Sequence, residues 1–368
     1  MIKQDLLEKI AAPLLDWYDR GHRRLPWRED KNPYRIWVSE IMLQQTRVEA
    51  VIPYFERFMA VFPDIASLAN AEDDVLLKNW EGLGYYSRAR NLKKAAVRIM
   101  QEYGGLMPDT WEELQKLPGI GSYTAGAIAS IAYNRRVPAV DGNVLRVLSR
   151  LRMDEDFITE QKVKKRVEEE LLPVMPKERP GDFNQALMEL GATVCIPNGE
   201  PKCSECPWKE FCLAREHGCT GDYPKKEKKK GRKTEPKTVL VLKHREEVVI
   251  HKRPENGLLA GLYELPNMEG HLSEDEVVCR LREEGLSPIR IERLPDAVHI
   301  FSHKEWHMIA YAVRIDELAG PYNYPNKDYL FVHPKETEAK YPIPSAFSAY
   351  AEYLDIKLGN EKFEKRGK

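Results

Sequence analysis

The sequence lacks any apolar run that approaches the roughly 20 residues needed to cross a bilayer. Its N-terminal stretch, MIKQDLLEKIAAPLLDWYDR, carries acidic residues and lacks the apolar core of a cleavable secretory signal. Neither sign of charge dominates, because 57 basic and 58 acidic side chains leave a formal net charge of −1. We therefore expect a cytoplasmic protein without membrane contact, whose overall charge gives no sign of a nucleic-acid partner, although a local basic patch remains compatible with one.

Cysteine is also scarce, and four of the six cysteines fall within residues 195–212. In a cytoplasmic protein such a group is more typical of metal ligands than of disulfides. Structural zinc often uses two Cys-x-x-Cys pairs, and this stretch has one pair flanked by single cysteines. The spacing by itself leaves zinc and a [4Fe-4S] cluster open for Cys195, Cys203, Cys206 and Cys212.

The 368 residues are enough for two domains. The clearest break is residues 224–238, with eight basic and two acidic side chains and no aliphatic or aromatic residue. Such a stretch cannot contribute to a core, so we expect an extended, mobile linker, either a solvated tether or a strap attracted to DNA. The expected organisation is a first domain 1–222, a basic linker 223–238, a second domain 239–357 and a charged tail 358–368.

Hydrophobic periodicity differs on the two sides of that linker. Before it, apolar residues recur at helical spacing in residues 36–44, 75–80 and 144–151. After it, residues 238–253 and 305–315 alternate with the period of a strand. The fold expected is multidomain, with an all-α domain followed by an α+β domain.

The motif LPGIG lies between two helical stretches, at residues 117–121. Gly119 and Gly121 allow a tight turn and leave amide groups at the N-terminus of the next helix, where an anion is favoured. The motif is therefore either a plain helix–helix turn or a site for a DNA phosphate. Small residues in the following helix, at 125–127 and 129, favour a closely packed hairpin.

Two carboxylates stand out by their neighbours. Glu40 shares a helical face with Ile36, Trp37 and Leu43, so it is either paired with a distant partner or has a raised pKa suited to a general acid. Asp141 precedes Gly142 and a helical stretch, which fits an N-cap, but a carboxylate there can also face a substrate and stabilise positive charge.

Together these pieces resemble one family, the adenine-specific mismatch DNA glycosylases of the MutY type, within the helix-hairpin-helix, endonuclease III-like superfamily. The motifs that carry the resemblance are LPWR at 25–28, WVSEIMLQQTRV at 37–48, EGLGYYSRA at 81–89, the LPGIG hairpin, VDGNV at 140–144 and the cysteine loop. The resemblance covers the first 215 residues and implies an all-α helix-hairpin-helix glycosylase domain. Because the superfamily commonly carries a [4Fe-4S] cluster, it favours iron–sulfur over zinc at residues 195–212.

The resemblance also implies residue roles in removing adenine that is mispaired with 8-oxoguanine or guanine in double-stranded DNA. Glu40 would protonate the departing adenine and Asp141 would stabilise the oxocarbenium-like sugar, as in two-carboxylate glycoside hydrolysis. The supporting residues would be Tyr123 and Asn143 at the sugar, Trp27, Arg28 and Leu43 in the adenine pocket, and Gln45, Thr46, Leu83, Tyr85, Gly119 and Gly121 on DNA.

Bifunctional members of the superfamily place a nucleophilic lysine just after the hairpin, where this chain has Tyr123. Tyrosine cannot form the Schiff base that leads to strand cleavage. The resemblance therefore implies a monofunctional glycosylase. A thymine or uracil mismatch glycosylase of the same superfamily is the alternative, since members change base by changing pocket residues.

The second domain resembles the MutT-like, or Nudix, fold, on the segment GLLAGLYELP at 257–266. Family resemblance implies that Phe301, Ser302 and His303 contact 8-oxoguanine. A Nudix hydrolase holds magnesium with an Arg-Glu-x-x-Glu-Glu helix, and residues 279–286 read CRLREEGL, without the first glutamate. We therefore expect a domain that reads the oxidised base without hydrolysing nucleotides.

The sequence departs from the family pattern at a few positions. The first cysteine gap holds seven residues where six are usual, and Gln185 stands where some relatives have a glutamate near the adenine pocket. Cys219 and Cys279 match no ligand position. The expected state is a monomer that binds damaged duplex DNA, associated with the nucleoid if the source is bacterial, and the linker could also bind a replication or repair partner.

Overall fold

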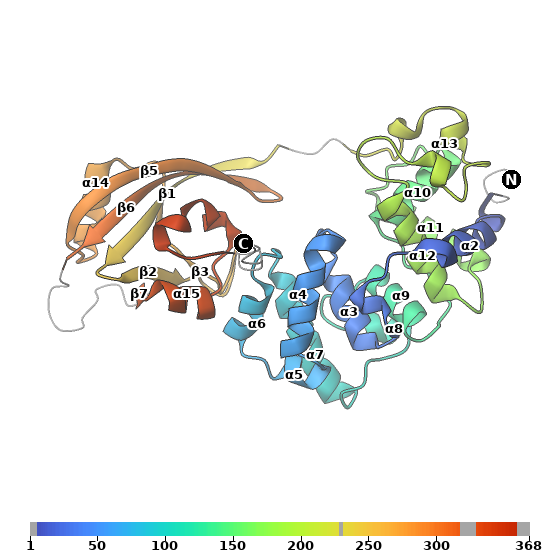
Figure 1. Ribbon diagram of the computed structural model, residues 1–368, viewed down its shortest axis with the longest axis horizontal. Coiled ribbons are helices and arrows are strands. Elements are labelled where there is room, and N and C mark those ends of the chain that lie inside the picture. Colours follow the sequence, from blue (N-terminus) through green and yellow to red (C-terminus); the bar gives the residue numbers. More distant parts are fainter. Residues whose placement is uncertain (1–5, 228–230, 317–328, 359–368) are drawn as a thin grey trace, which may run out of the picture. The chain divides into compact units, whose positions relative to one another are not determined.

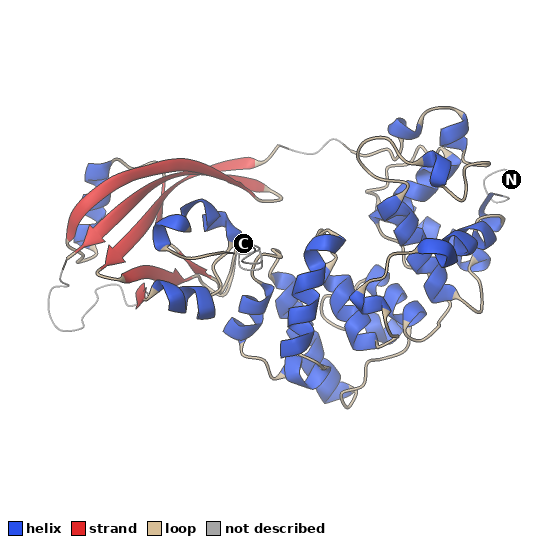
Figure 2. Cartoon of the chain, in the orientation of Figure 1, coloured by secondary structure: helices blue, strands red, loops and turns tan. Residues whose placement is uncertain are grey.

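The computed structural model describes residues 6–227, 231–316 and 329–358. The chain divides into two compact units: residues 1–70 with 91–229, and residues 71–90 with 230–368. Helices make up the first unit, whereas the strands belong to the second (Figure 2). The predicted order of an all-α domain and a domain containing a sheet is confirmed, but residues 71–90, expected in the first domain, pack with the second unit.

The first unit consists of α-helices, which Figure 1 labels, and of short 3-10 helices. They are α2 (Ala11–Gly21), η1 (Pro26–Arg28), α3 (Pro33–Met42), α4 (Val48–Val61), α5 (Ile65–Ala69), α8 (Trp111–Gln115), α9 (Ser122–Ile131), α10 (Gly142–Arg152), α11 (Gln161–Val174), α12 (Pro180–Thr193), η2 (Cys203–Glu205), α13 (Leu213–Glu216) and η3 (Thr220–Asp222). Helix α7 (Ser87–Glu102) runs from the second unit into the first. The predicted helices at 36–44 and 144–151 correspond to α3 and α10.

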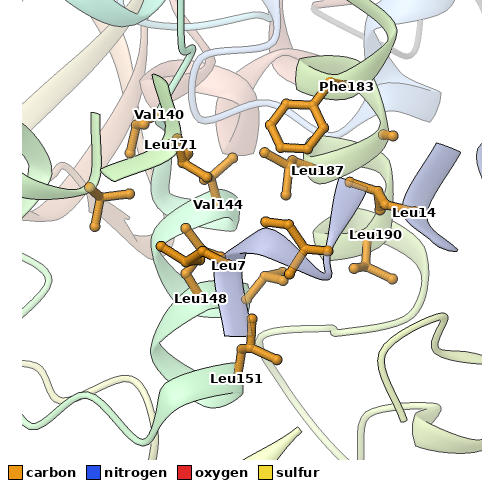
Figure 3. Packing of buried hydrophobic residues seen from close by; sticks show 14 of the residues in the cluster. Leu7, Leu14, Val140, Val144, Leu148, Leu151, Leu171, Phe183, Leu187 and Leu190 are labelled. Atoms are coloured by element: carbon orange, nitrogen blue, oxygen red, sulfur yellow. The ribbon is translucent and has the colours of Figure 1, made fainter. Parts of the chain in front are cut away.

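A hydrophobic core forms between α2, α10, α11 and α12 (Figure 3). Leucine and valine side chains from the inner faces of these helices are almost completely buried, as the i, i+3, i+4 spacing requires. Val140 and Val144 belong to this core, and they flank Asp141 in the sequence. Burial of these two neighbours fixes the backbone on both sides of the carboxylate.

The LPGIG motif forms the turn of a helical hairpin between α8 and α9. Gly119 adopts a φ of +78°, and a Cβ there would lie 2.7 Å from Cβ of Asn91. Further along α9, a Cβ on Gly126 would lie 2.4 Å from the carbonyl oxygen of Pro138. The glycine at 126 therefore allows the close helix packing that the small residues predicted.

The second unit is built on a sheet with the strand order β3-β2-β1-β6-β5, with β4 beside β1 and β7 beside β2. Strands β1 and β6 are parallel, and the other pairs of described strands are antiparallel. Its strands are β1 (Lys233–His244), β2 (Glu247–Lys252), β3 (Tyr263–Glu264), β4 (Asn267–Glu269), β5 (Pro288–Ile300), β6 (Lys304–Ile315) and β7 (Tyr329–Val332). Its helices are α6 (Asp73–Trp80), α14 (Glu274–Glu283), α15 (Pro334–Lys340), η4 (Ser345–Tyr350) and η5 (Glu352–Leu354).

Both faces of the sheet are covered. Along β1, Val239 and Val241 point into one hydrophobic cluster, and Leu240 and Leu242 point into another that includes α14. This period-two division follows from the alternation of side chains along a strand. The strands expected at 238–253 and 305–315 are confirmed as β1, β2 and β6.

The basic linker is shorter than the sequence predicted. Strand β1 begins at Lys233, and residues 233–238 pair with β6, so pairing of backbone amides and carbonyls compensates for the missing apolar side chains. Several linker cations also have acidic partners, which lowers the charge left for DNA. The pairs are Lys225–Glu155 at 3.6 Å, Arg232–Glu305 at 3.2 Å and Lys237–Glu269 at 3.7 Å.

Part of the predicted linker and nearly all of the predicted tail lie outside the described residues. The charged tail at 358–368 lies outside the described residues apart from Leu358, as do linker residues 228–230. Among the described helices, none is both long and apolar enough to cross a membrane.

Candidate active site

A cavity of about 960 Å³ opens in the helical unit, and residues from η1, α3, α9, α10 and α12 line it. It collects nine of the predicted site residues from four separate stretches of sequence. These are Trp27, Arg28, Glu40, Leu43, Gln45, Thr46, Tyr123, Asp141 and Asn143. The tertiary fold thus brings the two carboxylates and the expected adenine-pocket residues to one place.

Glu40 lies in α3, whose start is fixed by Pro33 in the first turn and by the Asn32 side chain, which accepts hydrogen bonds from Tyr34 and Arg35 amides. The carboxylate is only 7% exposed and accepts a hydrogen bond from the Tyr123 hydroxyl at 2.5 Å. Burial raises the pKa of Glu40 to about 7, although the Tyr123 hydrogen bond opposes the rise. Of the two alternatives, the raised pKa is therefore the one that the structure favours, and the partner from a distant helix is a neutral hydroxyl.

Tyr123 is the second residue of α9, directly after the hairpin turn. Burial, with the nearby Glu40 and Asp141 carboxylates, raises its pKa well above the usual value of a phenol. The hydroxyl therefore stays protonated and donates to Glu40 rather than accepting a proton from it. Its oxygen also lies 2.9 Å from the Met188 sulfur, on α12.

Asp141 is the N-cap of α10, as its position predicted. One oxygen accepts from the Val144 amide at 2.8 Å, and the other accepts from Asn143 Nδ2 at 2.7 Å. Burial raises the pKa of Asp141 above its usual value, and these two hydrogen bonds oppose that rise. Asn143 is itself held, because its Oδ1 accepts from Arg146 Nη2 at 2.8 Å. The carboxylate is thus both a cap and a fixed charge facing the cavity.

Glu189, on α12, is a site residue that the sequence reasoning missed. Its side chain is 2% exposed, and it accepts from Arg23 Nε at 2.7 Å and from Arg28 Nη2 at 2.9 Å. Although burial acts to raise the pKa of Glu189, the two guanidinium groups hold it below the usual value. A signal existed, since Glu189 sits among Ala186, Leu187 and Leu190 in the same way that Glu40 sits among apolar neighbours.

Glu189 fixes Arg28 at the wall of the cavity. We expect Glu189→Gln to lower roughly tenfold the single-turnover rate of the glycosylase reaction that the motif resemblance implies, which is the size typical of losing a charge-assisted hydrogen bond. Quenched-flow excision kinetics measure this. Glu49→Gln is the matched control, because Glu49 pairs with Arg23 at 3.6 Å but is 77% exposed, and its rate should change less than twofold. Equal rates for both variants and the wild type would contradict a role for Glu189.

The expected DNA-contacting residues of the helical unit lie at exposed turns. Gln45 is exposed and has a φ of +59°, in the short turn that follows α3. Gly121 is the N-cap of α9 and is exposed, and a Cβ placed there would meet no atom within 4 Å. Backbone amides at this helix start are suitable for a phosphate oxygen.

Residues expected at the opposite base line a second pocket, of about 330 Å³, in the sheet-containing unit. Tyr85 lines it together with Phe301, Ser302 and His303, so segments more than 200 residues apart meet there. Tyr85 is 46% exposed and has a φ of +47°. Leu83, which was expected beside it, is 6% exposed, so of the two Tyr85 has the exposure that a DNA contact requires.

The four clustered cysteines surround one small cavity, of about 20 Å³. The backbone amide of Trp208 donates to Cys206 Sγ at 3.4 Å, and Arg150 Nη1 donates to Cys195 Sγ at 3.4 Å. The first gap forms a loop with Gly199 at a φ of +78°, closed by the Lys202 amide donating to the Val194 carbonyl at 3.0 Å. Cysteine sulfurs that line one cavity, two of which accept hydrogen bonds, fit an iron–sulfur cluster held by thiolates.

Family models match both units of the chain. The model described as HhH-GPD superfamily base excision DNA repair protein matches residues 38–173, and the NUDIX domain model matches residues 238–353. A solved structure described as a thermostable thymine-DNA glycosylase is 25% identical, with a TM-score of 0.51 over 58% of this chain and 98% of its own. An endonuclease III–DNA complex, at 23% identity and a TM-score of 0.50, shares the fold over 58% of this chain and 98% of its own. The chain is a helix-hairpin-helix DNA glycosylase with an appended Nudix-like domain.

Curated relatives narrow the class to one family. Adenine DNA glycosylase of Mus musculus is 36% identical, over 84% of this chain and 71% of its own length. Adenine DNA glycosylase of Buchnera aphidicola is also 36% identical, over 82% of this chain and 85% of its own length. The chain belongs to the adenine DNA glycosylases, enzymes of base-excision repair that remove adenine, and the resemblance seen in its motifs is confirmed.

Proposed function

We propose that this enzyme removes adenine paired with 8-oxoguanine, or with guanine, in double-stranded DNA, and that it leaves the strand intact. The observation that carries the proposal is the grouping of Glu40, Tyr123 and Asp141 in one cavity. Two carboxylates with different surroundings are what a glycosidic bond requires for cleavage through a charged sugar. The cavity, of about 960 Å³, has room for an extruded nucleotide.

Glu40 acts as the acid. With a pKa raised to about 7, it is protonated in a large fraction of molecules at neutral pH and can donate its proton to the leaving adenine. Tyr123 holds one carboxyl oxygen through the 2.5 Å hydrogen bond and leaves the other available for the base. Proton transfer makes adenine a better leaving group, so the glycosidic bond breaks and the sugar becomes positively charged.

Asp141 acts on that sugar. Its carboxylate is fixed by the Val144 amide and by Asn143, so little reorganisation is needed when the positive charge develops. The negative charge stabilises the oxocarbenium-like sugar until water attacks its anomeric carbon. Trp27, Arg28 and Leu43 form the adenine side of the cavity, where Glu189 holds the Arg28 guanidinium.

The nature of residue 123 supports a monofunctional enzyme. A phenol whose pKa is raised above its usual value is neutral, and it cannot form a Schiff base with the sugar. The product is therefore an abasic site in an unbroken strand. Strand breaks should appear after hot alkali and not before.

The second pocket supports discrimination of the opposite base. Phe301, Ser302 and His303 offer an aromatic ring, a hydroxyl and an imidazole beside Tyr85, which can stack on a base and hydrogen bond to its edge. We assign contact with 8-oxoguanine to Ser302 and insertion into the vacated stack to Gln45 and Tyr85. Thr46, in the turn after α3, and the LPGIG amides, in the turn between α8 and α9, would contact the DNA backbone.

The test uses duplexes with adenine opposite 8-oxoguanine and opposite guanine, incubated with enzyme and then treated with hot alkali. We expect cleavage only in the adenine-containing strand, and faster reaction opposite 8-oxoguanine. Absence of an alkali-dependent product would refute the proposal. Thymine opposite guanine is run in parallel, because a thymine glycosylase shares the fold at 25% identity, and we expect no thymine release.

We further propose that Cys195, Cys203, Cys206 and Cys212 hold a [4Fe-4S] cluster. All four thiols line one cavity, which suits a cluster held by thiolates, and membership in a family whose superfamily commonly carries such a cluster favours iron–sulfur over zinc. The cluster would serve as a structural clip for the loop at 195–212, remote in sequence from Glu40 and Asp141.

Purified protein is expected to be brown, with broad visible absorption and about four iron atoms per chain. Cys206→Ser should lose the colour and the iron, because three thiolates hold the cluster weakly. Cys279→Ser is the matched control, since Cys279 is exposed on α14 in the other unit, and its spectrum should be unchanged. Colourless protein with stoichiometric zinc would contradict this assignment.

A further inference from the structure

Residues 71–90 come from the glycosylase part of the sequence but pack as part of the sheet-containing unit. Helix α6 lies in this segment, and the turn that follows it carries Tyr85. Asp74, in its first turn, accepts from Lys252 Nζ at 3.0 Å and from the Tyr263 hydroxyl at 2.8 Å. The segment is therefore fastened to the strands at its beginning.

Lys78 makes the central contacts. Its Nζ donates to the Tyr341 carbonyl at 2.7 Å, to the Thr337 carbonyl at 3.3 Å and to Glu81 Oε1 at 3.2 Å. The Lys78 side chain is 13% exposed. A lysine that is mostly buried and donates to three acceptors is held in one geometry, unlike a lysine at the surface.

Glu81 completes the arrangement from the end of α6. Its side chain is 3% exposed, and its Oε1 accepts from the Ile343 amide at 2.9 Å as well as from Lys78. Ile343 is adjacent in sequence to Pro344, Ser345 and Ala346, which line the second pocket. The Lys78–Glu81 pair thus holds the chain at the base of one pocket wall.

The opposite wall and the Tyr85 turn are held by the same segment. Arg90 donates to the Ala260 carbonyl, and Ala260 lines the pocket. Within the turn, Trp80 Nε1 donates to the Gly84 carbonyl at 3.1 Å, and Arg88 Nη2 donates to the same carbonyl at 3.1 Å. Trp80, next to Glu81, therefore links the pair directly to the backbone beside Tyr85.

We propose that Lys78 and Glu81 are positioning residues that set how strongly the enzyme distinguishes 8-oxoguanine from guanine opposite adenine. They neither line the excision cavity nor line the second pocket. They join the end of α6, which leads into the Tyr85 turn, to residues 337–343, which lead into residues 344–346 and lie about 260 positions away in sequence. This inference rests on the proposed function of the second pocket.

The contacts predict that breaking the Lys78–Glu81 pair slows excision opposite 8-oxoguanine more than excision opposite guanine. If Lys78 is replaced by methionine, the α6 end loses its hydrogen bonds to the Thr337 and Tyr341 carbonyls and keeps the one from the Ile343 amide to Glu81, so the chain that leads into residues 344–346 is held less firmly. The oxidised base is then held less well, whereas guanine, which gains less from this pocket, is affected little. Glu40 and Asp141 keep their own contacts, so the excision step itself is retained.

The test measures single-turnover excision of adenine opposite 8-oxoguanine and opposite guanine by Lys78→Met, at saturating enzyme. We expect the rate opposite 8-oxoguanine to fall about tenfold, the scale of losing a buried charged hydrogen bond, and the rate opposite guanine to stay within twofold. Lys340→Met is the matched control, since Lys340 forms an exposed pair with Glu336 in the same unit and its loss should leave both rates unchanged. Lys78→Arg, which keeps the charge, should restore most of the preference.

Discrimination equal to wild type in folded Lys78→Met would overturn the proposal, and so would an equal loss on both substrates. Glu81→Gln provides the second measurement if Lys78→Met does not fold, because an amide still accepts from Ile343 but no longer pairs with a charge. It should lose part of the preference, and an unchanged ratio there would also overturn the proposal. A wild-type enzyme without any preference for 8-oxoguanine would instead refute the proposed function of the pocket.

Discussion

Asp141→Asn is expected to abolish base excision while leaving the fold and DNA binding nearly intact. Removing the fixed negative charge beside the sugar should lower the single-turnover rate on the order of 10³-fold or more. Asparagine caps a helix about as well as aspartate, so its carbonyl oxygen can still accept from the Val144 amide. The amide cannot accept from Asn143 Nδ2 in the same way, and that one hydrogen bond is lost.

Alkali-cleavage kinetics measure the excision rate. Thermal unfolding measures the retained stability of the fold, and a DNA-binding titration measures the retained affinity. Asp64→Asn is the control, because Asp64 is the exposed N-cap of α5 and accepts from the Ser67 amide at 2.7 Å. That variant should keep the full rate. Turnover of Asp141→Asn within tenfold of wild type would remove Asp141 from the mechanism.

Glu40→Gln is expected to slow excision and, at alkaline pH, to stabilise the fold. Loss of the general acid should slow excision by roughly 10²- to 10⁴-fold. Burial raises the pKa of Glu40 to about 7, so the wild-type rate should fall as pH rises through that value and the acid loses its proton. The variant should lose this alkaline limb, since an amide does not titrate.

The second effect is on stability, and its sign follows from the raised pKa. Because the pKa of Glu40 is higher in the folded state than in the unfolded state, ionisation of this carboxyl destabilises the fold. The free energy of unfolding therefore falls as pH rises from about 4.5 through about 7. At pH 8 the neutral glutamine should therefore raise the free energy of unfolding, by as much as about 3 kcal/mol. The gain should disappear at pH 4.

Urea unfolding at pH 4 and pH 8 measures that difference. Glu189→Gln, in the same unit, is the contrasting control. Arg23 and Arg28 hold the pKa of Glu189 below its usual value, so its charge stabilises the fold above the unfolded-state pKa and the variant should lose stability at pH 8. If Glu40→Gln is also less stable at pH 8, the Glu40 carboxylate is better accommodated than its burial implies.

The sequence was most informative where a local pattern had a single physical explanation. Asp141 before a helical stretch predicted a cap, and Glu40 among Ile36, Trp37 and Leu43 predicted a buried carboxylate. Both are found, because a helix N-terminus and an apolar helix face are local features. The alternation at 238–253 predicted strands for the same reason.

The errors came from contacts that are distant in sequence. Residues 233–238 have no apolar side chains of their own to bury, yet they form a strand because β6 supplies hydrogen-bonding partners. Residues 71–90 read as part of the first domain, but Lys78 and Glu81 join them to residues 337–343. Glu189 was passed over because its two arginine partners lie about 160 positions away.

The sequence by itself determined the family, through motifs that resemble it, and it singled out the two carboxylates and the cysteine loop as candidates from residue types at short spacing. Tertiary structure decided which distant partner each buried charge has: Tyr123 for Glu40, Arg23 and Arg28 for Glu189, and the Ile343 amide for Glu81. The physical reason is that burial penalises an isolated charge, so its pKa and its role depend on neighbours that only the folded chain brings within hydrogen-bond distance.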